Sequence, residues 1–443
     1  MKTLKLKDER MTLSPINYRR FKHKFIEVKI SKDNKSITFI KYITQTRFYI
    51  PKSLRSEIDF KRGNTINFEF REIENRIRDK QIIKNNRFNL LGLIPEKTRS
   101  GYPILVMENE DKWRCWYLNY GGSKEITISK KLPLEFSKLL GYYQSEGRKN
   151  KVEKRRGREF TFTNTSLKII GDFTKLLSSL IDINILNICI YPNKNLTEEE
   201  IETLKENLVN LGLNKDKFKV YKPLQVRKYT IMLRMESTIF SDIIDSILEK
   251  TKEHITKEKS KYVKKLRIFF IRGLFNGDGT FVSIKDKYGS NHSWIQFFER
   301  DLPYIKEYKK MLEQLSLVGT IRKEKNKNVY TLTIYLNWTG LLNLFELGLL
   351  EDKNNHHKRL LETIKNHRWY KSQKYFIDLN SEFNGQDIRR LMPKDICYSW
   401  VRKRINEGTV KRIGMGGYQL TNHSLYVKNI LEKLEREKLN LKD

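Results

Sequence analysis

The chain has 443 residues, 12% of them aromatic, and a formal net charge of +35. This length allows two or three domains with separate cores, and the aromatic content excludes a disordered polymer. Three scattered cysteines exclude a disulfide framework, and no apolar run approaches the length of a membrane span. The opening stretch MKTLKLKDER has no apolar signal region behind its charges. We therefore expect a protein that is cytoplasmic and nucleoid-associated, or organellar, and not secreted.

The basic charge predicts a nucleic acid as the partner, because such an excess produces a positive surface field in any fold. Codon usage is a second explanation for the many lysines. The chain has no alanine and is rich in Lys, Ile and Asn, which is typical of an A/T-rich coding sequence. Codon bias does not explain why Asp and Glu number only 53. A nucleic acid remains the favoured partner.

Residues 1–125 are predicted to form a β-rich N-terminal domain. The stretch FKHKFIEVKISKDNKSITFIKYI alternates and turns at Asp33-Asn34, which indicates a hairpin. The stretch RFYIPKSLRSEIDFKRGNTINFEF that follows resembles the swapped-hairpin DNA-binding module of the AbrB type. An ordinary small β domain is the alternative.

An internal repeat fills residues 126–368, where helices alternate with strand pairs. LEFSKLLGYYQSEGRKN is echoed by LRIFFIRGLFNGDGTFV, and a strand, a helix, a strand pair and a closing helix follow each copy. The predicted hairpins are KVYKPLQVRKYTIMLRM in the first copy and TIRKEKNKNVYTLTIYL in the second. An acidic helix, TEEEIETLKENLVNLGL, is extra in the first copy. We predict two pseudo-twofold αββαββα repeats, at about 130–255 and 256–368.

Residues 371–443 have the order of a winged helix-turn-helix domain. A short helix, a turn and a second helix ending at Gly408 precede two short strands around GMGG. The stretch SWVRKRINE is the predicted recognition helix, and a helical cap with a stray hairpin is the alternative. The whole chain is thus predicted to be a mixed α/β (α+β) protein.

The repeated stretch places an acid at the end of a helix in each copy. Glu146 and Asp278 each stand one residue after a pair of small residues spaced four apart. Small residues at that spacing let two helices come into backbone contact, which would bring both acids to the same end. A carboxylate is disfavoured at the negative end of a helix. Two such acids side by side predict a site for a hard cation such as Mg²⁺.

The stretches LLGYYQSEG and IRGLFNGDG, with the strand–helix order after each, resemble the LAGLIDADG homing endonucleases in their single-chain, two-repeat form. The resemblance covers about 240 residues and departs at Glu146, where Asp is more usual. It implies a saddle-shaped DNA-binding core with Mg²⁺ (or Mn²⁺) held by Glu146 and Asp278, joined by Ser145 and Gly277. It also implies a basic residue in the loop after each repeat's last helix.

Two lysines are therefore added to the predicted catalytic set. Lys353 follows the last helix of the second copy, and Lys250 or Lys252 does so in the first. A solvated surface charge is the alternative for each of them. The predicted catalytic residues are thus Glu146, Asp278, Lys353 and Lys250.

DNA-reading side chains are expected at alternate positions of the hairpins, because a strand presents every second residue to one face. The predicted DNA-binding residues of the core and the tail are Arg158, Thr161, Thr163, Lys228, Lys285, Trp294, Gln296, Arg300, Lys323, Arg402, Lys403 and Arg404.

The resemblance implies a site-specific double-strand DNA endonuclease that hydrolyses phosphodiester bonds with a divalent metal. Two repeats in one chain supply both halves of the site, which predicts a monomer. Two alternatives remain on the same fold, an intron-encoded RNA maturase with intron RNA as its partner and a DNA-binding transcription regulator. Regulators of that lineage usually lack the acids, and both acids are present here.

Overall fold

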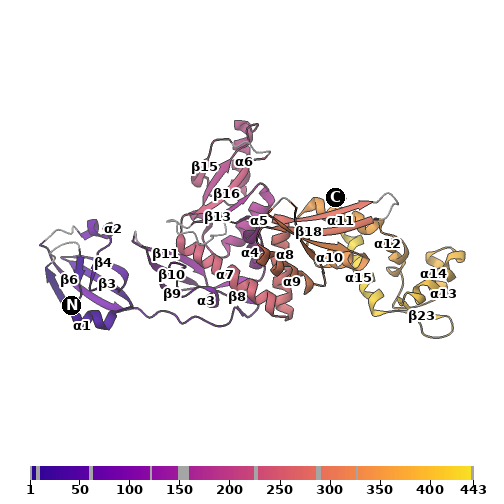
Figure 1. The fold of residues 1–443 in the computed structure, drawn as a ribbon, viewed down its shortest axis with the longest axis horizontal. Helices are drawn as coiled ribbons and strands as arrows, with labels where there is room; N and C mark the ends of the chain where they lie inside the picture. Colours follow the sequence, from indigo (N-terminus) through magenta and orange to yellow (C-terminus); the bar gives the residue numbers. More distant parts are fainter. Residues whose placement is uncertain are drawn as a thin grey trace. The chain divides into compact units, whose positions relative to one another are not determined.

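The computed structural model describes residues 2–5, 10–58, 63–119, 122–147, 159–223, 228–285, 291–325 and 328–440 (Figure 1). The chain divides into two compact units, Met1–Val263 and Lys264–Asp443. None of the helices in these described ranges has the length and apolar composition of a membrane span.

The first unit begins with a four-stranded antiparallel sheet in the order β1-β6-β3-β4. The predicted hairpin is confirmed, because Lys32 pairs with Lys35 across the turn and Asp33 has a φ of 52°. Inward-facing Ile26, Val28 and Ile30 belong to its buried core. The elements of this part are β1 (Lys2–Lys5), β2 (Arg10–Thr12), α1 (Pro15–Phe21), β3 (Phe25–Lys32), β4 (Lys35–Tyr42), β5 (Arg47–Tyr49), α2 (Lys52–Arg55) and β6 (Thr65–Glu72).

Two three-stranded sheets follow, in the orders β12-β8-β7 and β11-β10-β9. Trp116 of β10 packs edge-on against Phe25 of β3, with ring centroids 5.6 Å apart, which joins the sheet β11-β10-β9 to the four-stranded sheet. The short helix α3 packs against the long helix α7 of the first repeat. The elements are β7 (Ile83–Lys84), β8 (Arg87–Asn89), α3 (Leu90–Leu93), β9 (Ile104–Asn109), β10 (Lys112–Asn119), β11 (Gly122–Ser129) and β12 (Lys131–Pro133).

The first repeat follows in the same unit, with a sheet in the order β13-β16-β14-β15. Aromatic side chains join this sheet to its helices, since Phe162 stacks on Phe173 and Phe160 meets Phe240 edge-on. The elements are α4 (Phe136–Glu146), β13 (Phe160–Asn164), α5 (Leu167–Ser178), β14 (Asn187–Tyr191), α6 (Glu198–Asn210), β15 (Phe218–Val220), β16 (Thr230–Met235) and α7 (Thr238–Lys257).

The hairpin predicted in KVYKPLQVRKYTIMLRM is wrong. β15 pairs in parallel with β14, whereas β16 lies antiparallel between β13 and β14. The physical reason is the acidic helix α6, which follows β14 and acts as the crossover that a parallel pair requires. The strand pair of this repeat is therefore β14 with β16, and α6 with β15 is an insertion between them.

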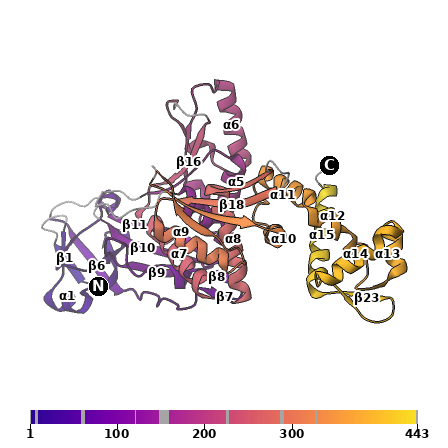
Figure 2. The same ribbon diagram turned by 45° about the vertical axis from the view of Figure 1, so that its right-hand side comes forward.

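The second unit opens with the second repeat, whose order is the predicted αββαββα. Its sheet has the order β17-β18-β20-β19, and the predicted hairpin of β19 and β20 is confirmed. Helices α9 and α10 pack against this sheet (Figure 2). The elements are α8 (Lys261–Asp278), β17 (Gly279–Lys285), β18 (Asn291–Glu299), α9 (Leu302–Glu313), β19 (Thr320–Lys323), β20 (Tyr330–Leu336) and α10 (Trp338–Glu346).

The tail has the predicted order of two short helices and a hairpin. Its second helix ends just before Gly408, which has a φ of 68°, a conformation that favours glycine. The hairpin joins a third strand in the order β21-β23-β22. Helices α11 (Asn354–Asn366) and α12 (Arg368–Gln373) lead from the second repeat to the tail. The elements of the tail itself are β21 (Glu382–Asn384), α13 (Gly385–Leu391), α14 (Lys394–Asn406), β22 (Val410–Arg412), β23 (Gly417–Leu420) and α15 (Asn422–Asn440).

One predicted DNA contact of the tail does not fit this structure. The side chain of Arg404 is only 1% exposed, and its guanidinium lies over the rings of Trp369 and Trp400 at 5.4 and 6.0 Å. Its Nη1 atom lies 2.8 Å from a carboxylate oxygen of Glu407. Arg404 points inward because it sits on the helix face that carries Cys397, Trp400 and Val401, so its role is structural.

Replacing Arg404 by alanine should lower the free energy of unfolding by about 2 to 4 kcal/mol, because Glu407 loses its partner and two indole rings lose a packed neighbour. Arg402→Ala is the matched control, since Arg402 is exposed two residues away, and it should change that free energy by less than about 0.5 kcal/mol. Thermal and urea unfolding measure both variants. Equal stabilities would contradict a structural role for Arg404.

Candidate active site

Glu146 is the last residue of α4, and its side chain is half-buried. The helix ends here because the N–H of Gly147 still donates to the carbonyl of Tyr143, at 3.0 Å, while the backbone of Gly147 is already extended. Gly147 then forms a bridge to Phe162 of β13. The acid is thus placed where a helix turns directly into the sheet.

Asp278 occupies the same position in the second repeat. It is the half-buried last residue of α8, and Gly279 after it pairs with Phe297 of β18 as Gly147 pairs with Phe162. The two acids are therefore equivalent within their repeats. The packing of α4 against α8 stays a prediction.

Each acid is followed by glycine because an aromatic ring lies against that position. A Cβ atom at Gly147 would lie 2.3 Å from Cδ2 of Tyr143, and one at Gly279 would lie 2.3 Å from Cδ2 of Phe275. Real Cβ atoms do not approach a neighbour so closely. The sequence contains a sign of this contact that the predictions above do not use, an aromatic residue four positions before the glycine in both copies.

A buried polar network holds Tyr143, the ring under Gly147. Its hydroxyl donates to Oδ1 of Asp245 in α7, at 3.2 Å, and Nη2 of Arg99 lies 2.9 Å from Oδ2 of the same carboxylate. The backbone N–H of Arg99 also donates to Asp242. Burial, together with Asp245, raises the pKa of Tyr143 well above its ordinary value. Sequence reasoning missed Arg99, because it lies far outside the repeat.

Lys353 holds the corresponding end of α8. Its ammonium donates to the carbonyls of Phe275 and Gly279, at 3.1 and 2.6 Å, and lies 5.3 Å from the ring of Phe275. These carbonyls flank Asp278 in the chain, so the structure places Lys353 beside the acid, in the loop where it was predicted. A cation there also offsets the negative end of the helix.

The loop before Lys353 is joined to α8 by further polar contacts. Arg272 forms an ion pair with Glu351, and the side-chain amide of Asn276 donates to Asp352 at 3.2 Å. Side chains from two turns of α8 thus engage the loop that carries the lysine. These contacts hold the loop against α8 and so fix the position from which the side chain of Lys353 extends.

The prediction of a loop at Lys250 is wrong. Both Lys250 and the alternative Lys252 lie inside α7, because buried apolar residues continue at helical spacing to Ile255. The Nζ atom of Lys250 donates to the carbonyl of Gly92, at 2.9 Å, and burial lowers its pKa. In this structure Lys250 joins α7 to the segment around α3.

Of the predicted metal ligands, the side chain of Ser145 is used within its own helix. Its hydroxyl donates to the carbonyls of Gly141 and Tyr142, at 3.3 and 3.0 Å. Gly277 can offer only its backbone carbonyl, and Ser145 can offer its own as well, because the last carbonyls of a helix have no intrahelical N–H partner. Among the described residues no cluster of three or more His, Cys, Asp or Glu side chains could hold a metal ion.

The predicted DNA-reading residues on the strands do not all lie on the face that was expected. Trp294 and Gln296 share one face of the second sheet, because they stand two residues apart on β18, opposite Val282 and Thr280. Lys285 falls on the opposite face by register, so the three do not form one row as expected. Thr161 and Thr163 share a face of the first sheet, where Thr161 is buried and Thr163 half-buried.

The other predicted contacts are basic residues. Arg158 lies outside the described residues. The side chains that are exposed to solvent are those of Lys228, Arg300, Lys323, Arg402 and Lys403. Their part in binding stays a prediction.

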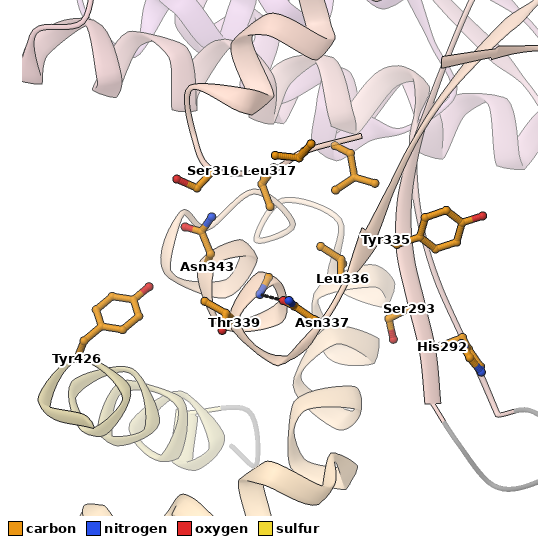
Figure 3. Close-up of a pocket in the computed structure, with 13 residues that line it drawn as sticks. His292, Ser293, Ser316, Leu317, Tyr335, Leu336, Asn337, Thr339, Asn343 and Tyr426 are labelled. Carbon is orange, nitrogen blue, oxygen red and sulfur yellow. Dashed lines mark hydrogen bonds between the residues drawn. The ribbon is translucent and has the colours of Figure 1, made fainter. Parts of the chain in front are cut away.

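A cavity of about 770 Å³ opens elsewhere in the second unit, between the ends of β18 and β20 and helices α10 and α15 (Figure 3). Tyr335 and His292 line one side of it, and Asn343 and Tyr426 line the other. None of the predicted catalytic residues lines this cavity. The candidate functional residues therefore lie at the helix ends of the two repeats, not at the cavity.

Replacing Gly147 by alanine should lower the free energy of unfolding by about 1 to 3 kcal/mol, because the added methyl group displaces the ring of Tyr143. Gly385→Ala is the matched control, since a Cβ there meets nothing within 4 Å, and it should be neutral within about 0.5 kcal/mol. Urea unfolding checks both. A Gly147→Ala protein as stable as the control would refute the contact.

No curated protein matches the chain. Among solved structures, I-DmoI in complex with DNA and Mn has 16% identity and a TM-score of 0.25, and the match covers 45% of this chain and 89% of that one. The meganuclease I-SmaMI bound to uncleaveable DNA has 13% identity and a TM-score of 0.28, covering 52% and 94%. At such TM-scores these likenesses support no conclusion alone. A family model described as a LAGLIDADG-like domain matches residues 265–337. That segment, from α8 to the end of β20, is therefore a LAGLIDADG-like domain.

Proposed function

We propose that the protein is a monomeric, site-specific DNA endonuclease that cuts both strands of a duplex by metal-dependent phosphodiester hydrolysis. The observation that carries the proposal is the repeated helix end. Glu146 and Asp278 each end a helix and precede a glycine that is packed on an aromatic ring and paired with the equivalent strand of its repeat. The family match covers only the second of these copies, and the first copy has the same local construction.

Charge and surface support duplex DNA as the substrate. The net charge of +35 suits a phosphate backbone, and Trp294 and Gln296 offer an aromatic and an amide group on one strand face.

The residues at the helix ends fit a hard divalent cation, Mg²⁺ or Mn²⁺. Glu146 and Asp278 would supply carboxylate oxygens, and Ser145 and Gly277 would supply backbone carbonyls, which are the donors that such ions prefer. A bound divalent ion would activate water and stabilise the leaving oxygen. The glycine contacts keep both carboxylates at the helix ends, where electrostatics alone disfavours them.

Lys353 has a separate role in this proposal. Its ammonium is held by two carbonyls that flank Asp278, so a positive charge stays beside the acid without replacing a metal ligand. There it can attract the scissile phosphate and stabilise charge that develops on it. In the first repeat Lys250 and Lys252 do not lie in a corresponding loop, because α7 continues through both of them.

The direct test is cleavage of a randomised duplex library with Mg²⁺ or Mn²⁺, followed by mapping of the cut ends. One long recurring site cut on both strands is the expected result. Binding without cleavage by the wild-type protein would refute the endonuclease. It would instead favour a regulator, or a maturase if intron RNA is bound.

Replacing Glu146 by Gln or Asp278 by Asn should lower cleavage by orders of magnitude, because each change removes a metal-binding charge and keeps the shape. The free energy of unfolding should hold or rise, since an acid leaves the negative end of a helix. DNA affinity without metal should also hold. Cleavage rates, calorimetric metal titration and thermal unfolding measure the three effects, and a variant that cuts at the wild-type rate would refute the assignment.

Replacing Lys353 by Met should lower the cleavage rate about tenfold or more at saturating metal. Loss of its two hydrogen bonds should cost only about 1 to 2 kcal/mol of stability. Lys310→Met, at an exposed position of α9, is the matched control and should leave both quantities unchanged. If the unfolded fraction of Lys353→Met accounts for the whole loss of activity, the lysine is only a helix cap.

A further inference from the structure

The C-terminal helix α15 returns to the second repeat. The hydroxyl of Tyr426 donates to Glu346 at the end of α10, at 2.6 Å, and the ammonium of Lys433 lies 5.2 Å from the ring of Phe345. Further along the helix, Glu437 lies 3.3 Å from Nε2 of His357 in α11. Three successive parts of α15 thus contact the repeat.

The same helix forms the core of the tail. Its side chains Val427, Ile430, Leu431 and Leu434 are almost completely buried. Tyr370 of α12 donates to Glu435, and the ammonium of Lys428 donates to the carbonyl of Leu379. One continuous helix therefore belongs to both parts, and it joins them without a flexible linker.

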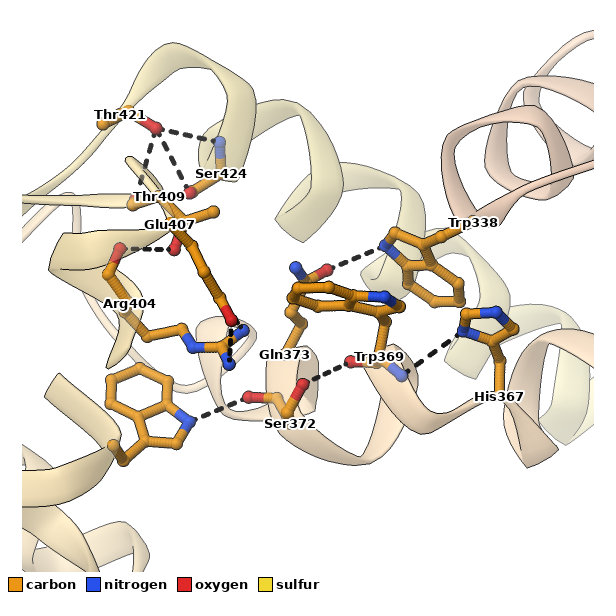
Figure 4. A network of polar contacts seen from close by, with 11 residues as sticks. Trp338, His367, Trp369, Ser372, Gln373, Arg404, Glu407, Thr409, Thr421 and Ser424 are labelled. Carbon is orange, nitrogen blue, oxygen red and sulfur yellow. Dashed lines mark hydrogen bonds and ion pairs between the residues drawn. The ribbon is translucent and has the colours of Figure 1, made fainter. Parts of the chain in front are cut away.

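A second connection runs through α12, between α10 and α14 (Figure 4). The indole N–H of Trp338, the first residue of α10, donates to the buried side chain of Gln373, at 2.9 Å. The indole N–H of Trp400 in α14 donates to the carbonyl of Ser372, at 2.8 Å. Buried groups of this kind are costly to separate, because each would lose its partner.

The predicted recognition helix is fixed to this connection from its inner side. The stack of Arg404 between Trp369 and Trp400 joins α14 to α12. On the outer side of the helix, Arg402 and Lys403 are exposed, and Tyr398 is 76% exposed. The surface offered to a duplex is therefore presented by a helix whose other face is locked.

We propose that the second repeat and the tail form one rigid DNA-reading body, held by α12 and α15. The protein then requires a fixed length of duplex between its cleavage position and the flanking segment that the tail binds. This inference rests on the proposed endonuclease function. It adds to that function a fixed spacing between the cut and the flanking segment of the target. The tail then contributes to the sequence specificity of the protein and is not only a tethered domain that raises its affinity for DNA.

The helical geometry of DNA makes binding sensitive to the length of duplex between the cut and the flanking segment. A turn of duplex contains about 10 base pairs and rises about 34 Å, so five inserted pairs move the flanking segment about half a turn around the axis. Ten pairs restore its face but displace it by a whole turn. A flexible tether would tolerate the second change. A rigid body would tolerate neither.

The first experiment uses the duplex recovered by cleavage selection, with 0, 2, 5 or 10 base pairs inserted between the cut and the flanking segment. Arg402→Ala/Lys403→Ala is the matched variant that lacks the tail's contacts. Wild-type affinity should fall to that of the variant on all three lengthened duplexes, and the variant should bind all four equally. Full wild-type affinity for the duplex with 10 added pairs would overturn the proposal.

The second experiment needs no DNA, so it separates failure of this inference from failure of the endonuclease. Cys115, Cys189 and Cys397 are buried, so spin labels can be directed to introduced cysteines. One label pair, Lys310→Cys with Lys411→Cys, spans the repeat and the tail. A reference pair, Lys310→Cys with Lys358→Cys, lies within α9 and α11.

Electron–electron dipolar spectroscopy should show a narrow distance distribution for each pair, and the two distributions should have the same width. A distribution for the spanning pair much broader than that of the reference pair would overturn the proposal. Thermal unfolding of each labelled protein checks that the exposed lysines were replaced without loss of fold.

Discussion

The contact between a glycine and the aromatic ring four residues before it determines the candidate site. Tyr143 lies against Gly147 and Phe275 lies against Gly279, and neither position has room for a Cβ atom. At both positions the helix ends at the acid, and the glycine after it pairs with a strand of the sheet. A carboxylate at that end is disfavoured by some tenths of a kcal/mol or more. The packing of ring on backbone holds it there.

The two repeats use different groups to support the same contact. In the second repeat, the loop after α10 folds onto α8 and brings Lys353 to the carbonyls beside Asp278. In the first, α7 continues where that loop would begin, and Arg99 from the preceding segment reaches the Tyr143–Asp245 pair instead. The acids thus lie in unlike surroundings. Unequal metal affinities at the two helix ends are the expected consequence.

The tail shows how one short basic stretch can serve two purposes. Arg402 and Lys403 face solvent, while Arg404, the next residue, is buried between two tryptophans. The inner side of α14 therefore joins the tail to the repeat, and the outer side is left for a duplex. A basic residue that looks like one more DNA contact is instead part of the connection between them.

The sequence alone determined the features that depend on local spacing. The acids after small residues, the order αββαββα in the second copy, the turn at Asp33-Asn34 and the loop position of Lys353 were all predictable, since each follows from the periodicity of a helix, a strand or a turn. Only the tertiary structure decided the parallel pairing of β15, the continuation of α7 through Lys250, the face of Lys285 and the burial of Arg404. Each of these depends on a partner distant in the chain or on register. The composition of a segment does not indicate which of its faces another part of the chain will cover.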